Sequence, residues 1–454
     1  MNLKGKKVLV VGLGTTGEAV CQFLLPRGAQ VKVSEKKTRG QLGQKMLYWE
    51  EKGVALEAGK HNHRSFLEAD LIVPSPGVPL LPEIEQAQAR GVKVLSEIEL
   101  AFIFLKGKIV GITGSNGKST TASLTHKILL EGGMPSFLAG NIGTPLISYA
   151  NDSKSSDVYV TEISSFQLQY IKQFKVSISV LLNISADHLD WHPSFSHYYE
   201  AKRKIISFQK EDAKAILNRD DPLAWELHTQ AKPQVYGFSR KERVHPGCFL
   251  EDDWIVISNG DAQKIMKTTE IPLLGIHNQE NVMAATLIGH LFRLSPERIR
   301  ESIRSFRGLE HRLEEVTTID GVNFYNDSKA TNVEASLKSV QSFPQPIVLI
   351  AGGRDKGGDF TKLKEPVKEK VKKLILIGEA KEKLALALEG TTAINEASSM
   401  EEAVVMGFSE AKPGDVVLLA PACTSFDMFQ NFEERGKLFK DAVLQLKKKR
   451  EKRS

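Results

Sequence analysis

A glycine-rich stretch carries the residue types that hold a nucleotide phosphate. It reads Gly111-Ile112-Thr113-Gly114-Ser115-Asn116-Gly117-Lys118-Ser119-Thr120 and lies between an apolar run at 108–110 and a stretch of helical spacing at 121–130. Glycines let backbone N–H groups face an anion, and the start of the helix adds the positive end of its dipole. Lys118 would meet the β- and γ-phosphates, and the Ser119 hydroxyl would coordinate Mg²⁺. Ile112 replaces the first glycine of the strict motif.

Polar side chains that could complete a magnesium site follow the next apolar runs. Asn141 lies in G-N-I-G, Glu162 follows the predicted strand 158–160, and His188 follows the predicted strand 176–183. Mg²⁺ prefers oxygen ligands on a stiff frame, with substrate phosphates completing its shell. Glu162 is therefore a candidate ligand. His188 is a weaker candidate, because a lone histidine is more often structural.

A second glycine motif opens the chain. Residues 12–17 read G-L-G-T-T-G, after an apolar strand at 8–11 and before a predicted helix at 18–25. A further strand at 31–33 leads to Glu35, which would bind a ribose hydroxyl in a dinucleotide site. The proline-rich loop 74–79 follows another strand, at 70–73, and is either a ligand loop or a plain tight turn. This pattern predicts that a nucleotide diphosphate binds here. A nicotinamide dehydrogenase, with NAD bound to residues 1–100, remains an alternative.

The last third of the chain repeats strands that end in polar loops. Predicted strands at 322–325, 347–350, 374–377 and 416–419 alternate with helical stretches, which indicates a parallel sheet whose loops share one edge. That edge would carry Lys329, Thr331, Lys356 and Ser425. Cations and hydroxyls together suit a small dicarboxylate or a departing phosphate.

The elements that position these residues predict an α/β protein. A length of 454 residues favours about three domains. We place them at 1–98, 99–308 and 309–454. Residues 217–267 show strands and turns, and 275–285 enter a helix with two asparagines near its start, for which capping is the default role.

Composition excludes several classes of partner. Of the formal net charge of +6, the tail 447–453 holds six positive and one negative charge, or +5, so the body is nearly neutral and no nucleic-acid partner is expected. We expect this tail to be frayed and solvated, with weak attraction to anionic lipid as a minor alternative. Three widely spaced cysteines favour a reducing, cytoplasmic setting, and no apolar run is long enough to span a membrane.

Taken together, the motifs resemble those of the Mur ligases over nearly the whole chain. T-G-S-N-G-K-S-T at 113–120 and H-N-x-x-N at 277–281 look like the superfamily. N-D-S-K-A-T-N at 326–332 and the segment 421–436 are similar to the members that add D-glutamate. The resemblance implies a Rossmann-like UDP-binding domain, a central phosphate-loop ATPase-like domain with a mostly parallel sheet, and a C-terminal Rossmann-like α/β domain with the basic tail.

The resemblance also implies the role of individual residues. ATP would be held by Gly114, Asn116, Gly117, Lys118, Ser119, Thr120, Asn281, Arg312, Asp327 and Lys329. The UDP-linked substrate would contact Thr15, Thr16, Lys36, Lys37, Ser75, Pro76, Gly77 and Asn141, although the two lysines depart from the family pattern. D-Glutamate would be held by Thr331, Lys356, Ser425, Phe426 and Phe432. Mg²⁺ would be bound by Ser119, Glu162, His188 and a carbamylated Lys202, and the catalytic residues would be Lys118, His188 and Lys202.

The implied activity is ATP-dependent ligation of D-glutamate to UDP-N-acetylmuramoyl-L-alanine through an acyl phosphate, by a soluble monomer in peptidoglycan precursor synthesis. From the residues alone, Lys202 is one charge on a basic helical face. A related ligase that extends folate with glutamate shares the phosphate loop, but the separate N-terminal nucleotide domain and N-D-S-K-A-T-N stand against it. A phosphate-loop regulatory switch is a further alternative, and it predicts nucleotide hydrolysis that is indifferent to amino acids.

Overall fold

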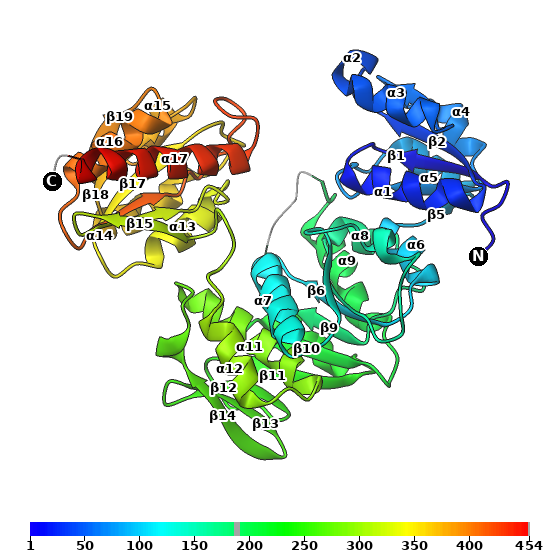
Figure 1. Ribbon diagram of the computed structural model, residues 1–454, viewed down its shortest axis with the longest axis horizontal. Coiled ribbons are helices and arrows are strands. Elements are labelled where there is room, and N and C mark those ends of the chain that lie inside the picture. The colour runs from blue at the N-terminus through cyan, green and yellow to red at the C-terminus, as the bar shows by residue number, and fades with distance from the viewer. Residues whose placement is uncertain (186–190, 453–454) are drawn as a thin grey trace. The chain divides into compact units, whose positions relative to one another are not determined.

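The computed structural model describes residues 1–185 and 191–452 and confirms the α/β class. Three sheets carry the fold (Figure 1). The chain forms two compact units, Met1–Glu270 with Gln279–Arg304, and Ile271–Asn278 with Ser305–Ser454. Each sheet lies within one of the three segments predicted as domains, and that division itself stays a prediction. No helix among the described residues is both long enough and apolar enough to cross a membrane.

The first sheet is wholly parallel, in the order β3-β2-β1-β4-β5. Its strands are β1 (Lys7–Val11), β2 (Gln30–Glu35), β3 (Ala55–Ala58), β4 (Leu71–Pro74) and β5 (Lys93–Val94). Alternate residues face opposite sides, so that Val8 and Val10 pack with α1 and α3, and Leu9 and Val11 pack with α4 and α5. Its helices are α1 (Thr15–Leu24), α2 (Arg39–Leu42), α3 (Gln44–Glu51), α4 (His63–Leu67) and α5 (Pro82–Ala89).

The second sheet has the order β14-β13-β12-β11-β10-β9-β6-β8-β7 and is parallel from β7 to β12. Its strands are β6 (Lys108–Thr113), β7 (Ser136–Gly140), β8 (Val158–Glu162), β9 (Ile178–Leu181), β10 (Lys214–Asn218), β11 (Gln234–Ser239), β12 (Gly247–Glu251), β13 (Trp254–Asn259) and β14 (Asp261–Lys267). The helices of this segment are α6 (Glu97–Phe104), α7 (Lys118–Glu131), α8 (Ser165–Gln169), α9 (Phe195–Ser207), α10 (Pro222–Trp225), α11 (Ile276–Leu291) and α12 (Pro296–Arg304).

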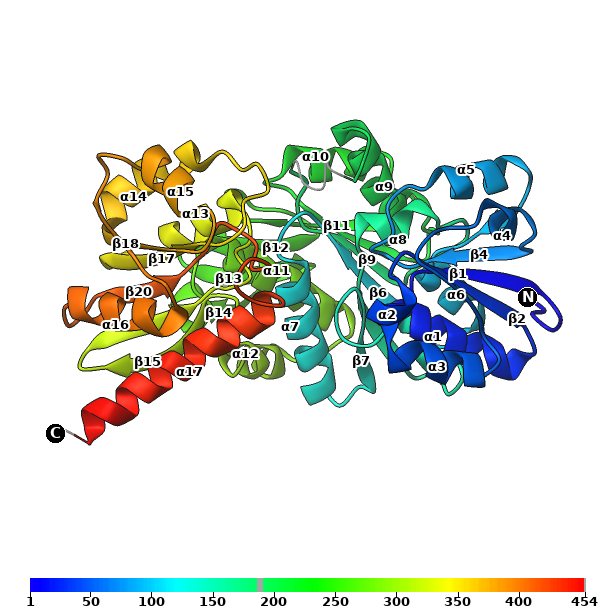
Figure 2. The same ribbon diagram turned by 90° about the horizontal axis from the view of Figure 1, so that it is seen from above.

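The third sheet has the order β15-β16-β20-β17-β18-β19, with only β15 antiparallel. Its strands are β15 (Glu314–Ile319), β16 (Val322–Asn326), β17 (Ile347–Gly352), β18 (Val371–Ile377), β19 (Ala393–Glu396) and β20 (Val416–Leu419). Ile347 and Leu349 pack with α13, α14 and α15, whereas Val348 and Ile350 pack with α16 and α17 (Figure 2). These helices are α13 (Val333–Gln341), α14 (Lys364–Lys370), α15 (Lys381–Ala387), α16 (Met400–Glu410) and α17 (Phe432–Glu451).

The predicted strands lie where expected within a few residues, and the parallel third sheet with one shared loop edge is confirmed. The expectation of a frayed basic tail is wrong up to residue 451, because α17 runs to Glu451. Lys447 donates to Thr317 Oγ1 at 2.8 Å, and Arg450 donates to Asp320 at 2.9 Å. The tail is therefore helical and tied to β15 and the turn that follows it.

Candidate active site

The phosphate loop connects β6 to α7, as the sequence predicts. Gly117 is the N-cap of α7 with φ of 85°, a conformation that side chains disfavour. A Cβ at this position would lie 2.2 Å from Asn281 Oδ1, which also accepts a hydrogen bond from Thr121 Oγ1 at 3.2 Å. Asn281 lies within α11 and does not cap it, so the default capping interpretation is wrong for this residue. Because Gly117 has no side chain, the Asn281 amide of α11 can lie directly against the phosphate loop.

The other side of the loop is held by side chains from the following strands and helices. Asn183 accepts from Asn116 N at 2.8 Å and donates to Asn116 O at 3.1 Å. Ser115 Oγ lies 2.7 Å from Tyr198 OH. Lys118 Nζ donates to Gly114 O at 2.8 Å and to Ser115 O at 2.9 Å. The predicted phosphate-binding lysine therefore lies against its own loop, which is fixed from both sides.

Lys202 is buried, so it is more than the one charge on a basic helical face that the residues alone indicated. Only 1% of this residue is exposed, and Nζ donates to Gly114 O at 2.8 Å. Its ammonium also lies 4.8 Å from the centre of the Tyr198 ring. The physical reason is helical spacing: Tyr198, Ala201, Lys202 and Ile205 share the buried face of α9. The Lys202 side chain therefore extends from α9 to contact the phosphate loop.

Glu162 has the features of a metal ligand. It is the last residue of β8, pairs in register with Ile112 of β6, and is 2% exposed. Oε1 accepts from Asn141 Nδ2 at 2.8 Å, while Oε2 is buried and has no hydrogen-bond partner among the described residues. A buried carboxylate oxygen without a partner is costly unless a cation or donor satisfies it. With the Ser119 hydroxyl at the start of α7, the donors are oxygens of the kind that Mg²⁺ prefers.

Further candidate ligands cannot be placed in the same way. His188 lies outside the described residues, as do Asp187 and Asp190. Among the residues that the structure describes, there is no group of three His, Cys, Asp or Glu side chains suited to a metal. Within the described part of the chain, the magnesium hypothesis therefore depends on Glu162, Ser119 and the neighbouring Lys202.

The segment that follows Glu162 in the chain takes part in an aromatic cluster that the sequence did not reveal. Ser165, at the start of α8, bonds the buried His192 through Oγ and Nε2 at 2.9 Å. The Phe166 ring lies 4.3 Å from that of Trp191, and the indole N–H donates to Val78 O at 3.2 Å. The cluster thereby joins the segment after β8 to the proline-rich loop of the first sheet.

The N-terminal glycine motif forms a second ligand edge. Thr15 and Thr16 are in the first turn of α1, and Ser75 Oγ donates to Gly12 O at 3.2 Å, which brings the glycine loop and the proline-rich loop together. Glu35 accepts from Leu13 N at 2.7 Å and from Lys37 N at 2.9 Å. In the structure its carboxylate thus braces the glycine loop, whereas the sequence suggested a ribose ligand. Lys36, Lys37 and Gly77 are exposed, while Pro76 is half-buried.

The predicted D-glutamate residues lie on three loops and one helix start at a single edge of the third sheet. Main-chain bonds join these loops: Ala422 N donates to Ala330 O at 3.0 Å, and Arg354 and Thr424 exchange two bonds at 2.9 and 3.0 Å. The loops carry Thr331, Lys356, Ser425 and Phe426, and α17 begins at Phe432. Ser425 is buried, whereas Lys356 and Phe426 are exposed. Cationic, hydroxyl and aromatic groups therefore share this edge.

The remaining predicted nucleotide residues of this unit also lie close together. Asp327 is buried and bonded by Ser339 Oγ, and burial raises its pKa to about 6 although the charge of Arg312 acts in the opposite direction. Lys329 Nζ lies 3.8 Å from the centre of the Phe432 ring. Burial, together with the charges of Lys338 and Arg312, lowers the pKa of His277 to about 4. Arg312 therefore lies near Asp327, as a shared nucleotide site requires.

The second sheet leads into a glycine phosphate loop that carries Lys118, and a strand-end acid, Glu162, follows the neighbouring strand. Together with the second α/β unit, these features define the class as a nucleotide-dependent α/β enzyme. Family models agree: the Mur ligase MurD-like N-terminal domain matches residues 6–96, the Mur ligase middle domain matches 112–289, and the Mur ligase glutamate ligase domain matches 311–423. The chain belongs to the Mur ligase family.

Similar proteins cover the chain from end to end. A protein from Koribacter versatilis is 45% identical over 98% of this chain and 98% of its own length. One from Acidobacterium capsulatum is 46% identical over 98% of this chain and 97% of its own length. Both are called UDP-N-acetylmuramoylalanine--D-glutamate ligase. Among solved structures, the UDP-N-acetylmuramate-alanine ligase of Thermotoga maritima matches with a TM-score of 0.61 at 16% identity, over 97% of this chain and all of that one. The MurF ligase of the same organism, solved in complex with ADP, has a TM-score of 0.59 at 17% identity, over 98% of this chain and 96% of that one. These structural likenesses support the fold.

Proposed function

We propose that this chain is the ATP-dependent ligase that joins D-glutamate to UDP-N-acetylmuramoyl-L-alanine in peptidoglycan precursor synthesis. The observation that carries the proposal is the phosphate loop, with Lys118, Lys202 and Glu162 around it, in a chain that matches D-glutamate ligases over its full length. The cation- and hydroxyl-bearing edge of the third sheet provides a matching site for a dicarboxylate amine. We expect a cytoplasmic monomer.

The reaction that these sites support has two steps. The terminal carboxylate of the muramoyl-alanine substrate attacks the γ-phosphorus of ATP, which forms an acyl phosphate and releases ADP. The D-glutamate amine then attacks the acyl carbon, loses a proton, and displaces phosphate to leave the amide. Lys118 would neutralise charge on the transferring phosphoryl group, and the loop N–H groups would hold the remaining oxygens.

Ser119, Glu162 and a carbamylated Lys202 would hold Mg²⁺, with His188 as a further ligand, and the ion would supply Lewis-acid neutralisation of phosphate charge. The unpartnered Glu162 Oε2 supports this assignment. Carbamylation would exchange the Lys202 ammonium, which bonds Gly114 O, for an anionic oxygen donor beside the same loop. Asn141, bonded to Glu162, would face the muramoyl-alanine end together with His188.

The other substrates would be held at the two remaining edges. Thr15, Thr16 and the loop 75–77 would contact the UDP-linked substrate, with Lys36 and Lys37 near its nucleotide. Thr331, Lys356, Ser425, Phe426 and Phe432 would hold D-glutamate. In the ATP site, Asn281, Arg312, Asp327 and Lys329 would join Gly114, Asn116, Gly117 and Thr120 of the loop.

The experiment that tests the proposal measures ADP formation by the full-length protein with UDP-N-acetylmuramoyl-L-alanine, ATP and Mg²⁺. D-Glutamate should drive ADP formation one-for-one with new amide, while L-glutamate and other amino acids should not. ADP formation that is indifferent to the amino acid would instead indicate a regulatory nucleotide hydrolase. Tight NAD binding without ligation would indicate a dehydrogenase.

Lys202 has its own test. Lys202→Ala should lose ligation, and short carboxylates added to the assay should restore part of it, because they supply the missing anionic oxygen. Lys202→Arg keeps a cation but cannot form the carbamate, and it should stay inactive. If Lys202→Ala loses ligation and short carboxylates do not restore any of it, the result would argue against the carbamate.

A further inference from the structure

The turn that carries Arg312 has an unfavourable backbone. His311 and Leu313, on either side of it, have φ of 62° and 43°, in the left-handed region that residues with a Cβ rarely adopt. Two such residues around one arginine persist only where the surroundings over-determine the conformation, and such strain gathers at functional sites. The contacts that hold this turn are therefore informative.

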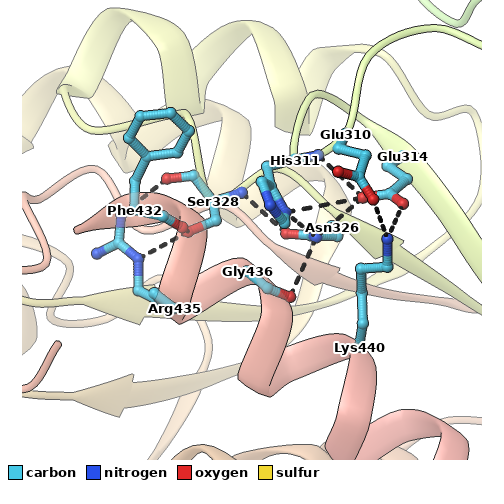
Figure 3. Close-up of polar contacts among 9 residues, drawn as sticks. All are labelled: Glu310, His311, Glu314, Asn326, Ser328, Phe432, Arg435, Gly436 and Lys440. Carbon is cyan, nitrogen blue, oxygen red and sulfur yellow. Dashed lines mark hydrogen bonds and ion pairs between the residues drawn. The ribbon is translucent and has the colours of Figure 1, made fainter. Parts of the chain in front are cut away.

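A polar cluster fixes the turn from beneath (Figure 3). Glu314 Oε2 accepts the backbone N–H of His311 at 2.9 Å, and Asn326 Nδ2 donates to His311 Nδ1 at 2.9 Å and to Glu314 Oε2 at 3.1 Å. The main chain adds a bond from Lys329 N to His311 O at 3.0 Å. Both the backbone and the ring of His311 are thus held, and Glu314 is the acceptor that the two sets of contacts share.

Helix α17 completes the cluster. Lys440 forms ion pairs with Glu314 and, at 3.0 Å, with Glu310, and 24% of its side chain is exposed. One turn earlier, a Cβ at Gly436 would lie 2.3 Å from His311 Nδ1, so that only glycine admits the ring. The Gly436 carbonyl accepts from Asn326 Nδ2 at 3.3 Å. Helix α17 therefore contacts the turn through both Lys440 and Gly436.

We propose that Lys440 and Glu314 are positioning residues, which hold the strained turn so that Arg312 meets the phosphates of ATP. The inference rests on the proposed function, which assigns Arg312 to the nucleotide. Lys440 fixes the carboxylate that binds His311 N, and without that ion pair the turn relaxes toward ordinary backbone angles and displaces Arg312. The D-glutamate loops have additional supports that do not involve Lys440: the Arg354–Thr424 backbone pair and the bonds of Arg435 to Ser328 and Cys423.

The test uses Lys440→Met in the full-length protein. We expect the KM for ATP to rise roughly three- to tenfold, with the KM for D-glutamate and for the UDP-linked substrate changed by less than about twofold. Lys440→Arg should restore the KM for ATP, because it keeps a cation that reaches both carboxylates. Lys447→Met is the matched control: this lysine lies on the same helix but donates to Thr317 Oγ1, away from the turn.

Several outcomes would overturn the inference. Equal increases in all three KM values, or a lower Tm with every KM unchanged, would show that Lys440 supports the fold only. If Lys440→Met does not fold, Glu314→Gln takes its place: it retains an oxygen for His311 N but breaks the ion pair between this side chain and Lys440, leaving Glu310 as the remaining partner, and it should show the same selective rise. If wild type makes no amide, the proposed function fails. Calorimetry with ATP then decides the inference, since unchanged affinity in Lys440→Met would contradict it and weaker affinity would support it.

Discussion

The guanidinium of Arg435 donates to both the hydroxyl and the backbone carbonyl of Ser328, at 3.0 and 2.8 Å (Figure 3). A third bond, of 3.1 Å, runs to the carbonyl of Cys423. Arg435 is fully buried, and burial lowers its pKa to about 10, which leaves it charged at neutral pH. One side chain at the start of α17 therefore joins the loop after β16 to the loop after β20, the two loops that carry Thr331 and Ser425.

Replacing Arg435 by Met should destabilise the second unit strongly. The carbonyls of Ser328 and Cys423 would lose their donor in a dry environment, at about 1–3 kcal/mol for each group, so we expect a loss of about 3 kcal/mol or more in the free energy of unfolding. Denaturant unfolding measures this loss. Arg435→Lys should recover only part of it, because an ammonium cannot reproduce the planar fork. Full stability in Arg435→Met would contradict the prediction.

Lys118→Ala should reduce ligation below roughly 1% of wild type, since the cation that opposes phosphate charge is lost from the loop. Initial rates of ADP formation at saturating substrates measure the change. Lys127→Ala is the control: Lys127 lies on the same helix α7 but forms an ion pair with Glu131 at the far end of the helix from the loop, so its rate should stay near wild type. Near-normal turnover in Lys118→Ala would rule out the role proposed for this lysine.

Local sequence patterns were sufficient for the strands and for the loops at their ends. Buried strands such as β20 are continuous apolar runs, and glycine or proline follows them, so that Val416–Leu419 and the loop beginning at Pro421 could be read directly. Thr331, Lys356 and Ser425 share an edge because the strands before them are parallel neighbours. This part of the candidate site follows from topology.

Local patterns did not predict which polar side chains are buried or paired by residues far away in the sequence. Lys202 stands beside the basic residues Arg203 and Lys204 in the sequence, and only the helical phase of α9 places it on the buried face of that helix. Arg435 and Lys440 received no individual role from the sequence, because their partners Ser328, Glu310 and Glu314 are more than 100 residues away along the chain. The fixed basic end of α17 was missed because its partners, Thr317 and Asp320, are equally distant.

Glu162→Gln should raise the Mg²⁺ concentration needed for half-maximal ligation and lower kcat by roughly 100-fold, because a neutral amide oxygen replaces the anionic ligand. Magnesium titrations of the rate measure both. Asp157→Asn is the matched control: it neutralises another buried acid, just before the opposite end of β8, whose carboxylate accepts from Lys154 N and Tyr159 OH. Its stability should fall while its Mg²⁺ response stays that of wild type. An unchanged magnesium response in Glu162→Gln would remove Glu162 from the metal site.

Glu97 should make stability depend on pH near neutrality. It is 1% exposed in α6, accepts from Ile147 N at 2.6 Å, and burial raises its pKa from 4.5 to about 7. A carboxyl whose pKa is higher in the folded state stabilises that state while protonated. Its contribution is complete below pH 4.5 and is lost as the pH rises to about 7, which amounts to about 3 kcal/mol for this shift.

Glu97→Gln removes that ionisation, so its free energy of unfolding should change less than that of wild type between pH 5 and 8, and the difference between the two should favour the variant increasingly toward pH 8. Denaturant unfolding of both proteins at matched pH values measures the difference. The two proteins share every other titrating group, so unrelated pH effects cancel in the comparison. If the stability curves of wild type and Glu97→Gln run parallel across this range, Glu97 ionises at an ordinary pKa and its carboxylate is hydrated in the folded protein.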